Sequence, residues 1–435
     1  MSAKGAVPAA SPPPALYKLA AALENATPTN LFASAARPMT SKEEFKVTRT
    51  KEQAELEEGE EAGEDISYET ALGIKRMIYG SRMFMVDHEW KKASFLRRPI
   101  GGTFPYGLLM PKDKSRGLLI AVQAQLIHII LAGEEETGHS ALDPAKVAAR
   151  LKLSSERKQR RSFVEALTRI LWRAGQEKKA KVVLLYSAYA GLLYSEEKRL
   201  EHFIKTIKVV ECVTYERLRK VMEKRLHMFE HRDGGGALMF LYSLILSRTI
   251  TQLEDDLQGD VLLTADDQCS LSLINLILNG QATPYLFNGN QEYDLNSKPL
   301  DVVRRGIQKR AEIGILVVDR PEGKDAKNHK KVLIGSMLKT PVRPIWVLRL
   351  RGRYSLFFCC NLNLNRDWRS EAKFHLSFYT GQPEEKEEAR LTVDSRIRLR
   401  DEKKRDDKVI PVVDECIKDR WPGANVDWNG TPPFY

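Results

Sequence analysis

The sequence predicts an α+β protein in which a long helical part precedes a mostly antiparallel sheet. Apolar residues recur at helical spacing from about residue 68 to residue 309. After residue 312 the chain changes to short runs rich in β-branched and aromatic residues, bounded by turn residues or charges. Helices followed by a series of strands are typical of the α+β class.

Each element is predicted from its own spacing. Apolar residues three or four positions apart share one face of a helix, whereas strand residues point alternately to two faces. Helices are expected at residues 68–79, 116–132, 143–151, 156–174, 193–230, 236–250, 268–279 and 298–309. Strands are expected at residues 313–319, 344–350, 353–360, 373–380 and 389–395.

The N-terminal residues 1–66 are expected to be disordered. They contain a Pro/Ala/Ser-rich opening and an acidic run, EQAELEEGEEAGED, with too few large apolar residues for a core. Residues 67–435 show no internal repeat and no Pro/Gly-rich linker. We therefore expect one large domain after the extension.

Composition and cysteine usage limit the class of protein. The chain has 435 residues, of which 43% are hydrophobic and 29% charged, as in ordinary globular proteins. No apolar run approaches the roughly 20 residues of a membrane span, so no membrane partner is expected. Five scattered cysteines without a CxxC pair argue against a disulfide framework and a zinc site, and favour the reducing cytosol or nucleus.

The net charge of +11 raises the question of an acidic partner such as nucleic acid. A basic stretch surrounds the helix expected at residues 156–174, but only Trp172 lies among its cations and no nucleic-acid-binding module is recognisable. We interpret it as a solvated helix face, and nucleic acid as a third-ranked partner. The stretch comprises Arg157, Lys158, Arg160, Arg161, Arg169, Arg173, Lys178, Lys179 and Lys181.

Three further patterns have ordinary structural explanations. GGGALMF (234–240) lacks the lysine of a phosphate loop and is interpreted as the start of a buried helix. His227 and His231 stand four residues apart but lack a third metal ligand, so no metal or cofactor is expected. Cys359 and Cys360 point to opposite faces of an apolar strand and are interpreted as buried small hydrophobes.

The stretch GLLMPKDKSRGLLIAVQA (107–124) has the form of a nucleophile site. An apolar segment leads into a polar loop, and the loop opens directly into an apolar helix. Thiol hydrolases place their cysteine at the first turn of such a helix, where the backbone stabilises thiolate. This chain has Arg116 at that place.

Several colinear blocks make residues 68–435 similar to the MINDY family of deubiquitinases, specifically its fourth branch. The most specific blocks are RDWRSEAKFHLSFYTG (366–381) and CIKDRWPGANVDWNGTPP (416–433). Weaker ones are IKRMIYGSRMFMVDHEWKKASF (74–95), ALMFLYSLILSRT (237–249), LSLINLILNGQATPYLFNG (271–289) and GSMLKTPVRPIWVLRLRGRYSLFF (335–358). The resemblance implies a papain-like cysteine-protease fold.

The resemblance also implies a cysteine–histidine mechanism. In the family a glutamine holds the oxyanion, a cysteine six residues later opens the helix, and a histidine on a distant strand accepts the thiol proton. The corresponding positions here are Met110, Arg116 and Arg353. Arginine is neither a nucleophile nor deprotonated near neutrality, and Ser115 would still lack a base.

We therefore expect an inactive deubiquitinase-like protein that binds ubiquitin, polyubiquitin or a partner in ubiquitin signalling. The family resemblance points to the polyubiquitin chains that mark proteins for the proteasome. A weak or conditional deubiquitinase is the alternative. If the alignment holds, Arg116 and Arg353 should face one cleft with Met110. Such a cleft needs an anion, which would be an internal carboxylate, the C-terminal carboxylate of ubiquitin, or the acidic segment Glu52–Asp65.

Overall fold

The computed structural model describes residues 63–82, 87–110, 112–133, 143–185, 204, 206–294, 296–319, 332–396 and 411–433. These residues all belong to one compact unit, Glu57–Tyr435. Residues 1–62 of the extension that was predicted to be disordered lie outside the described residues, so that prediction stays open.

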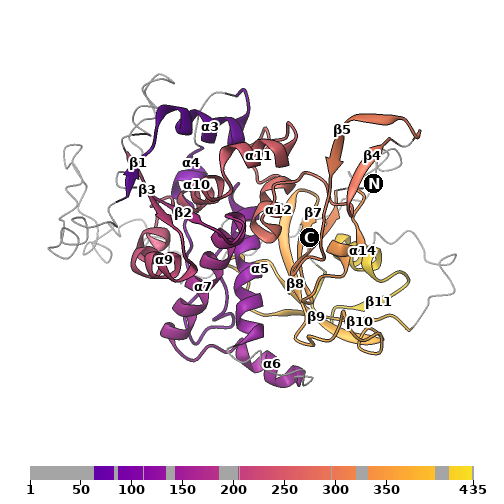
Figure 1. The fold of residues 1–435 in the computed structure, drawn as a ribbon. Coiled ribbons are helices and arrows are strands. Elements are labelled where there is room, and N and C mark those ends of the chain that lie inside the picture. Colours follow the sequence, from indigo (N-terminus) through magenta and orange to yellow (C-terminus); the bar gives the residue numbers. More distant parts are fainter. Residues whose placement is uncertain are drawn as a thin grey trace, which may run out of the picture. The chain divides into compact units, whose positions relative to one another are not determined.

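Helices dominate the described chain up to residue 279, and strands dominate after it, which confirms the α+β class (Figure 1). The helices are α3 (Tyr68–Tyr79), α4 (His88–Lys92), α5 (Arg116–Ala132), α6 (Pro144–Arg150), α7 (Glu156–Ala174), α9 (Tyr215–Glu230), α10 (Gly236–Arg248), α11 (Ile250–Leu257), α12 (Leu271–Asn279), α13 (Ser336–Lys339) and α14 (Val412–Arg420). The predicted bounds of α3, α5 and α7 match those observed.

The strands form three sheets. A six-stranded sheet has the order β11-β10-β9-β8-β7-β6, a three-stranded sheet the order β1-β3-β2, and β4 pairs with β5 alone. The strands are β1 (Glu64–Asp65), β2 (Ala180–Leu185), β3 (Ile207–Cys212), β4 (Asn290–Tyr293), β5 (Pro299–Arg305), β6 (Gly314–Val318), β7 (Ile345–Leu350), β8 (Arg353–Phe358), β9 (Lys373–Tyr379), β10 (Ala389–Asp394) and β11 (Asn425–Asp427). Every pairing is antiparallel except β6 with β7.

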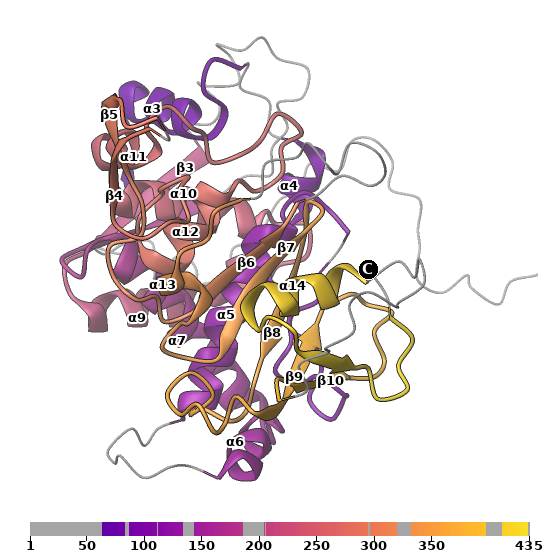
Figure 2. The same cartoon turned by 90° about the vertical axis from the view of Figure 1, so that its right-hand side faces the viewer.

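The six-stranded sheet separates two hydrophobic cores. Tyr354, Leu356 and Phe358 of β8 belong to the larger core, which also contains α5. Phe357, which points the other way, belongs to a smaller core with α14. Figure 2 shows α14 in front of the sheet and α5 behind it. The direction in which a β8 side chain points therefore decides whether it can reach the start of α5.

Helix α10 covers the free edge of β2. Ser247 Oγ accepts the backbone N–H of Lys181 at 2.9 Å, and Ser243 Oγ accepts that of Val183 at 2.8 Å. Residues four apart on a helix and residues two apart on a strand have similar spacing along their axes. One face of α10 can therefore accept hydrogen bonds from the backbone N–H groups at the edge of β2, which could otherwise pair with a strand of another chain. In the described chain no single helix is long and apolar enough to cross a membrane; α10 and α11 pass that test jointly but meet at 91°.

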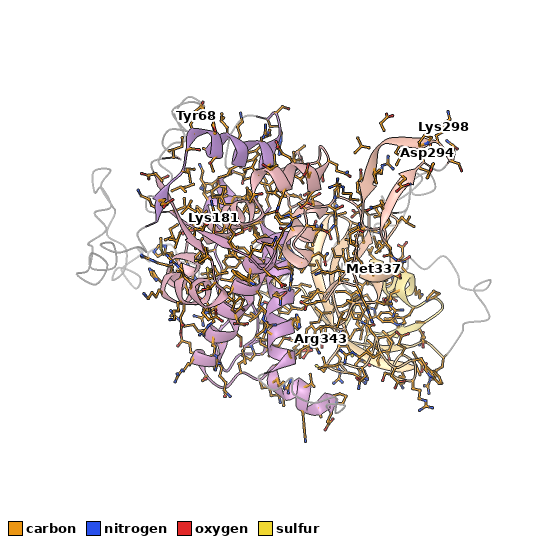
Figure 3. The ribbon with its side chains drawn as sticks, viewed as in Figure 1. Tyr68, Lys181, Asp294, Lys298, Met337 and Arg343 are labelled. Atoms are coloured by element: carbon orange, nitrogen blue, oxygen red, sulfur yellow. The ribbon has the colours of Figure 1, made fainter. Side chains whose placement is uncertain are left out.

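Two predicted helices are wrong in part or whole. Within 193–230, residues 207–212 form β3, because Val209 and Val210 pair with β2 and their β-branched side chains suit a strand. Residues 204 and 206 and helix α9 are helical as predicted, and residues 193–203 and 205 lie outside the described part. The predicted helix 298–309 is instead β5 of a hairpin with β4. Asp294 and Lys298 mark its projecting tip (Figure 3).

The start of the folded part also differs from the prediction. Glu64 and Asp65 form β1, which pairs with Val209 and Lys208 of β3, and Ile66 is buried. Residues 63–66, which were assigned to the extension, are therefore part of the described structure. An edge strand is held by backbone hydrogen bonds, which apolar patterning does not report.

Candidate functional site

Arg116 is the first residue of α5, as predicted. Ser115 precedes it in a helical conformation and provides no side-chain cap. Instead Asp113 Oδ1 accepts hydrogen bonds from the backbone N–H of Ser115 at 3.0 Å and from its Oγ at 2.6 Å. The polar turn before the helix is thus closed by its own carboxylate. Burial raises the pKa of Asp113, against the hydrogen bonds from Ser115 and the nearby charge of Arg116.

The guanidinium of Arg116 is buried and spans from the helix to two strands. Its Nε donates to the carbonyl oxygen of Tyr354 at 2.8 Å, and its Nη2 donates to that of Thr380 just after β9. Its Nη1 is buried and has no hydrogen-bond partner among the described residues. Arg116 therefore fastens the start of α5 to the sheet through backbone carbonyls. The described residues provide it with no carboxylate within ion-pair distance.

Met110 fills the space beside this contact. Its side chain is fully buried, and a Cβ placed on Gly381 would lie 2.7 Å from Met110 Cγ. The backbone N–H of Met110 donates to the carbonyl of Gly381 at 2.9 Å. Tyr379 adds a hydrogen bond from its hydroxyl to the carbonyl of Leu108 at 2.8 Å. The segment after β9 is therefore packed tightly against the segment before the helix.

Arg353 does not face the same site, contrary to the expected shared cleft. It is exposed at the start of β8 and lies directly opposite Leu350 of β7, whose side chain belongs to the α14-side core. The next residue, Tyr354, points to the α5 side, where its ring would lie 2.9 Å from a Cβ on Gly117. The two-residue turn between β7 and β8, with φ of +48° and +78°, fixes this alternation.

A cysteine that sequence reasoning did not connect with this site lies at the first turn of α5. Cys269 Sγ accepts a hydrogen bond from the backbone N–H of Leu118 at 3.2 Å. The hydroxyl of Tyr354 donates to the carbonyl of Cys269 at 2.9 Å. Burial raises the pKa of Cys269 to about 12 despite the helix amide, so the thiol is neutral near pH 7. The sequence around Cys269 has no feature that signals this contact.

The two lysines before Arg116 have acidic neighbours of their own. Lys112 Nζ lies 3.8 Å from Glu384, and Lys114 Nζ lies 2.8 Å from Asp87. The hydrogen bond to Asp87 raises the pKa of Lys114. Local carboxylates therefore offset the expected excess of positive charge. Arg116 itself donates from Nε and Nη2 to two carbonyl oxygens, whereas its buried Nη1 has no partner among the described residues.

The basic stretch is largely engaged in contacts within the protein. Arg173 Nη2 lies 2.8 Å from Glu312, and Arg169 pairs with Glu165 at 2.8 Å. Lys179 and Lys181 lie within 4 Å of Glu211, at 3.8 and 3.3 Å. These pairs favour the interpretation as a structural, solvated face.

The contacts of the remaining candidate residues indicate structural roles. His227 Nδ1 contacts the carbonyl of Lys224, and no group of three metal-ligating side chains occurs among the described residues. Burial raises the pKa of Cys359 to about 12 and that of Cys360 to about 11. Gly236 opens the buried helix α10, where a Cβ would lie 2.0 Å from the carbonyl oxygen of Phe229. That glycine is required for packing.

A helix whose first turn abuts the start and end of two antiparallel strands is the frame of a papain-like thiol hydrolase. The family model for the deubiquitinating enzyme MINDY-3/4, conserved domain, matches residues 75–430. The chain belongs to this family, whose fold is papain-like. No solved structure matches the chain.

Named relatives agree with this membership. The chain is 30% identical over 377 residues to the probable ubiquitin carboxyl-terminal hydrolase MINDY-4 of Xenopus tropicalis, and 30% identical over 375 residues to that of Homo sapiens. Each match covers 86% of this chain and 47% of the relative. The ubiquitin carboxyl-terminal hydrolase MINDY-3 of Danio rerio is 25% identical over 197 residues, 44% of this chain and 41% of the relative. The chain spans about half the length of these curated relatives.

Proposed function

We propose that this chain is a catalytically inactive member of its deubiquitinase family that binds ubiquitin or polyubiquitin. The observation that carries the proposal is the buried guanidinium of Arg116. It stands where the family resemblance puts the nucleophile, and it donates to the carbonyls of Tyr354 and Thr380. A guanidinium in that position cannot attack a carbonyl carbon.

The surroundings of Arg116 support the loss of hydrolysis. Met110 offers a thioether in place of an amide donor, so it cannot stabilise an oxyanion. Arg353 lies on the opposite face of the sheet from α5, so its orientation does not support assigning the position of the catalytic histidine to residue 353. The proposal therefore rests on the missing nucleophile at Arg116 and the missing oxyanion donor at Met110.

The geometry favours binding through a folded surface over capture of the ubiquitin tail. Arg116 already donates to two backbone carbonyls, and Lys112 and Lys114 already have acidic neighbours. A free carboxylate would have to displace these contacts. We therefore propose that the C-terminal residues of ubiquitin contribute little to binding. The relatives are named as probable ubiquitin carboxyl-terminal hydrolases, which supports ubiquitin as the partner.

The direct test is a pull-down of the full chain on ubiquitin chains of defined linkage and several lengths, with cleavage of the same chains measured in parallel. We expect binding without cleavage, and equal binding of monoubiquitin with and without its last two glycines. Absence of binding to every chain would contradict the ubiquitin partner. Loss of binding on removing the glycines would restore the tail-capture hypothesis.

The alternative, a conditional deubiquitinase, is favoured by one observation, the thiol of Cys269 at the first turn of α5. The raised pKa of Cys269 argues against this alternative, because a buried neutral thiol is a poor nucleophile.

All five cysteines are free thiols. That supports our proposal that the protein acts in the reducing cytosol or nucleus.

A further inference from the structure

We propose that the turn carrying Trp368 is a docking site for an acidic, partly apolar segment of a partner protein. Trp368 lies between β8 and β9 and exposes 76% of its surface, more than any other large hydrophobic residue in the described chain. Tryptophan and arginine are enriched at the residues that dominate binding energy in protein interfaces. This inference does not depend on the binding of ubiquitin.

Hydrogen bonds from Arg310 and Asn365 hold the start of the turn that carries Trp368. Arg310 donates from Nε to the carbonyl of Thr340 at 2.6 Å, and from Nη2 to those of Pro341 at 3.0 Å and Asn365 at 3.2 Å. Asn365 Nδ2 also donates to Pro341 at 3.0 Å. These contacts tie the start of the turn to the segment after α13.

The turn is fixed at its other end as well. The backbone N–H of Asp367 donates to Asn363 at 2.9 Å, and Asp367 Oδ1 accepts from the backbone of Arg369 at 3.1 Å. Glu371 pairs with Arg420 at the end of α14 at 2.7 Å. An exposed indole on an ordered turn loses little conformational freedom when a partner binds, which favours affinity.

Two exposed arginines, Arg366 and Arg369, flank Trp368, together with one exposed carboxylate, that of Asp367. The guanidinium of Arg369 lies over the Trp368 ring, 5.5 Å from its centroid. Arg366 is exposed and makes no ion pair with any residue that the structure describes. Arginine forks match carboxylates, so the partner should present Asp or Glu beside an apolar side chain.

The same features fit nucleic acid less well. Single strands are bound along basic grooves in which several aromatic side chains stack on successive bases. The other highly exposed aromatic residues of the described chain, Tyr68 and Tyr293, lie on α3 and β4. A single aromatic anchor with an arginine rim therefore favours a peptide segment over a nucleic-acid strand.

Trp368 provides its own spectroscopic signal. Trp90, Trp346, Trp421 and Trp428 are buried and Trp172 is half-buried, so acrylamide should quench mainly the fluorescence of Trp368. The probe is a synthetic peptide of repeated Glu-Leu-Asp units, added to the full chain. Comparison ligands are the same peptide with Gln and Asn in place of the acids, and an oligothymidine of similar length.

We expect the acidic peptide to bind, to shield Trp368 from acrylamide, and to bind more weakly as salt is raised. With a fluorescent label on the peptide, so that binding is measured without the Trp368 signal, Trp368→Ala should weaken binding about tenfold, as expected of an interface anchor. Arg366→Gln/Arg369→Gln should also weaken it. The matched control, Arg157→Gln/Lys158→Gln on the exposed start of α7, removes the same charge and should bind as wild type.

Three results would overturn the proposal. The acidic peptide does not bind, or the Trp368 and arginine variants bind it as wild type does. The third is that oligothymidine alone binds and the same variants lose it, which would make this a nucleic-acid surface. Because Trp368 and Arg366 are exposed, circular dichroism should confirm that the variants fold normally.

Discussion

At the scale of single residues, an arginine has taken a structural role where the family resemblance puts a nucleophile. Arg116 contributes two hydrogen bonds between elements that are far apart in sequence, and both acceptors are backbone carbonyls. Arg353, at the position to which the family resemblance assigns the histidine, is exposed. The two arginines therefore differ in what their removal should do.

Arg116→Ala should lower the free energy of unfolding by about 1–3 kcal/mol, because two buried carbonyls lose their charged donor. Arg353→Ala is the matched control and should stay within about 0.5 kcal/mol of wild type. Urea unfolding with an unchanged m-value measures both. Equal effects of the two substitutions would contradict the structural role of Arg116.

A second residue-scale prediction concerns repair of the site. Arg116→Cys should not hydrolyse ubiquitin chains, and adding Arg353→His should not help, because position 353 faces away from α5. Combining Arg116→Cys with Tyr354→His puts an imidazole on the α5 side. There the pKa of the introduced thiol should be about 1 unit or more lower than in the Arg353→His combination. The pH dependence of thiol alkylation measures this, and identical profiles would refute the assigned alternation of β8.

At the scale of elements, a partly buried polar network joins α5, α7, α12 and the segment before β6. His128 and Gln125 of α5 contact each other at 3.3 Å, and Arg173 of α7 donates to Gln125, Glu312 and the carbonyl of Leu278. Burial lowers the pKa of His128 to about 4, partly opposed by Glu312. The folded state therefore holds His128 neutral at a pH at which the unfolded chain would bind a proton.

The sign of this shift gives a pH prediction. Between the ordinary histidine pKa of about 6.5 and the folded value of about 4, the unfolded state binds more protons, so stability falls as the pH is lowered. His128→Gln should remove up to about 3 kcal/mol of this loss, whereas His227→Gln, on an exposed helix face, should not. Urea unfolding at several pH values provides the curves. Parallel curves for wild type and His128→Gln would contradict the assignment.

The elements also show where sequence reasoning succeeds. Helix α5 was predicted with its observed bounds because a polar turn precedes a long apolar run. Strand β3 differs from the prediction because the helical spacing on either side hides the β-branched pair Val209 and Val210. Strand β5 differs because it is exposed on both faces, so its sequence shows no alternation of apolar and polar residues. The position of Arg116 followed from the sequence, but the direction of Arg353 depends on a turn with positive φ. The contact of Cys269 depends on tertiary packing alone.

At the scale of the whole molecule, the domain boundary is a testable consequence of β1 and Ile66. A chain beginning at Gly63 should keep the stability of the full chain, whereas one beginning at Ser67 loses β1 and the burial of Ile66. The loss should be about 2 kcal/mol or more, from burial of one large aliphatic side chain and an edge pairing. Differential scanning calorimetry of both truncations tests this. Equal thermal unfolding midpoints for the two truncated chains would mean that the stable domain begins at residue 67.

The central claim is that the family's frame persists while the start of α5 lacks a reactive thiol. The most direct measurement is intact-mass analysis of the full chain after incubation with a ubiquitin probe bearing a C-terminal electrophile, with an active deubiquitinase as positive control. We predict no adduct on the wild-type chain. An adduct that disappears in Cys269→Ala would contradict the account and identify a conditional deubiquitinase.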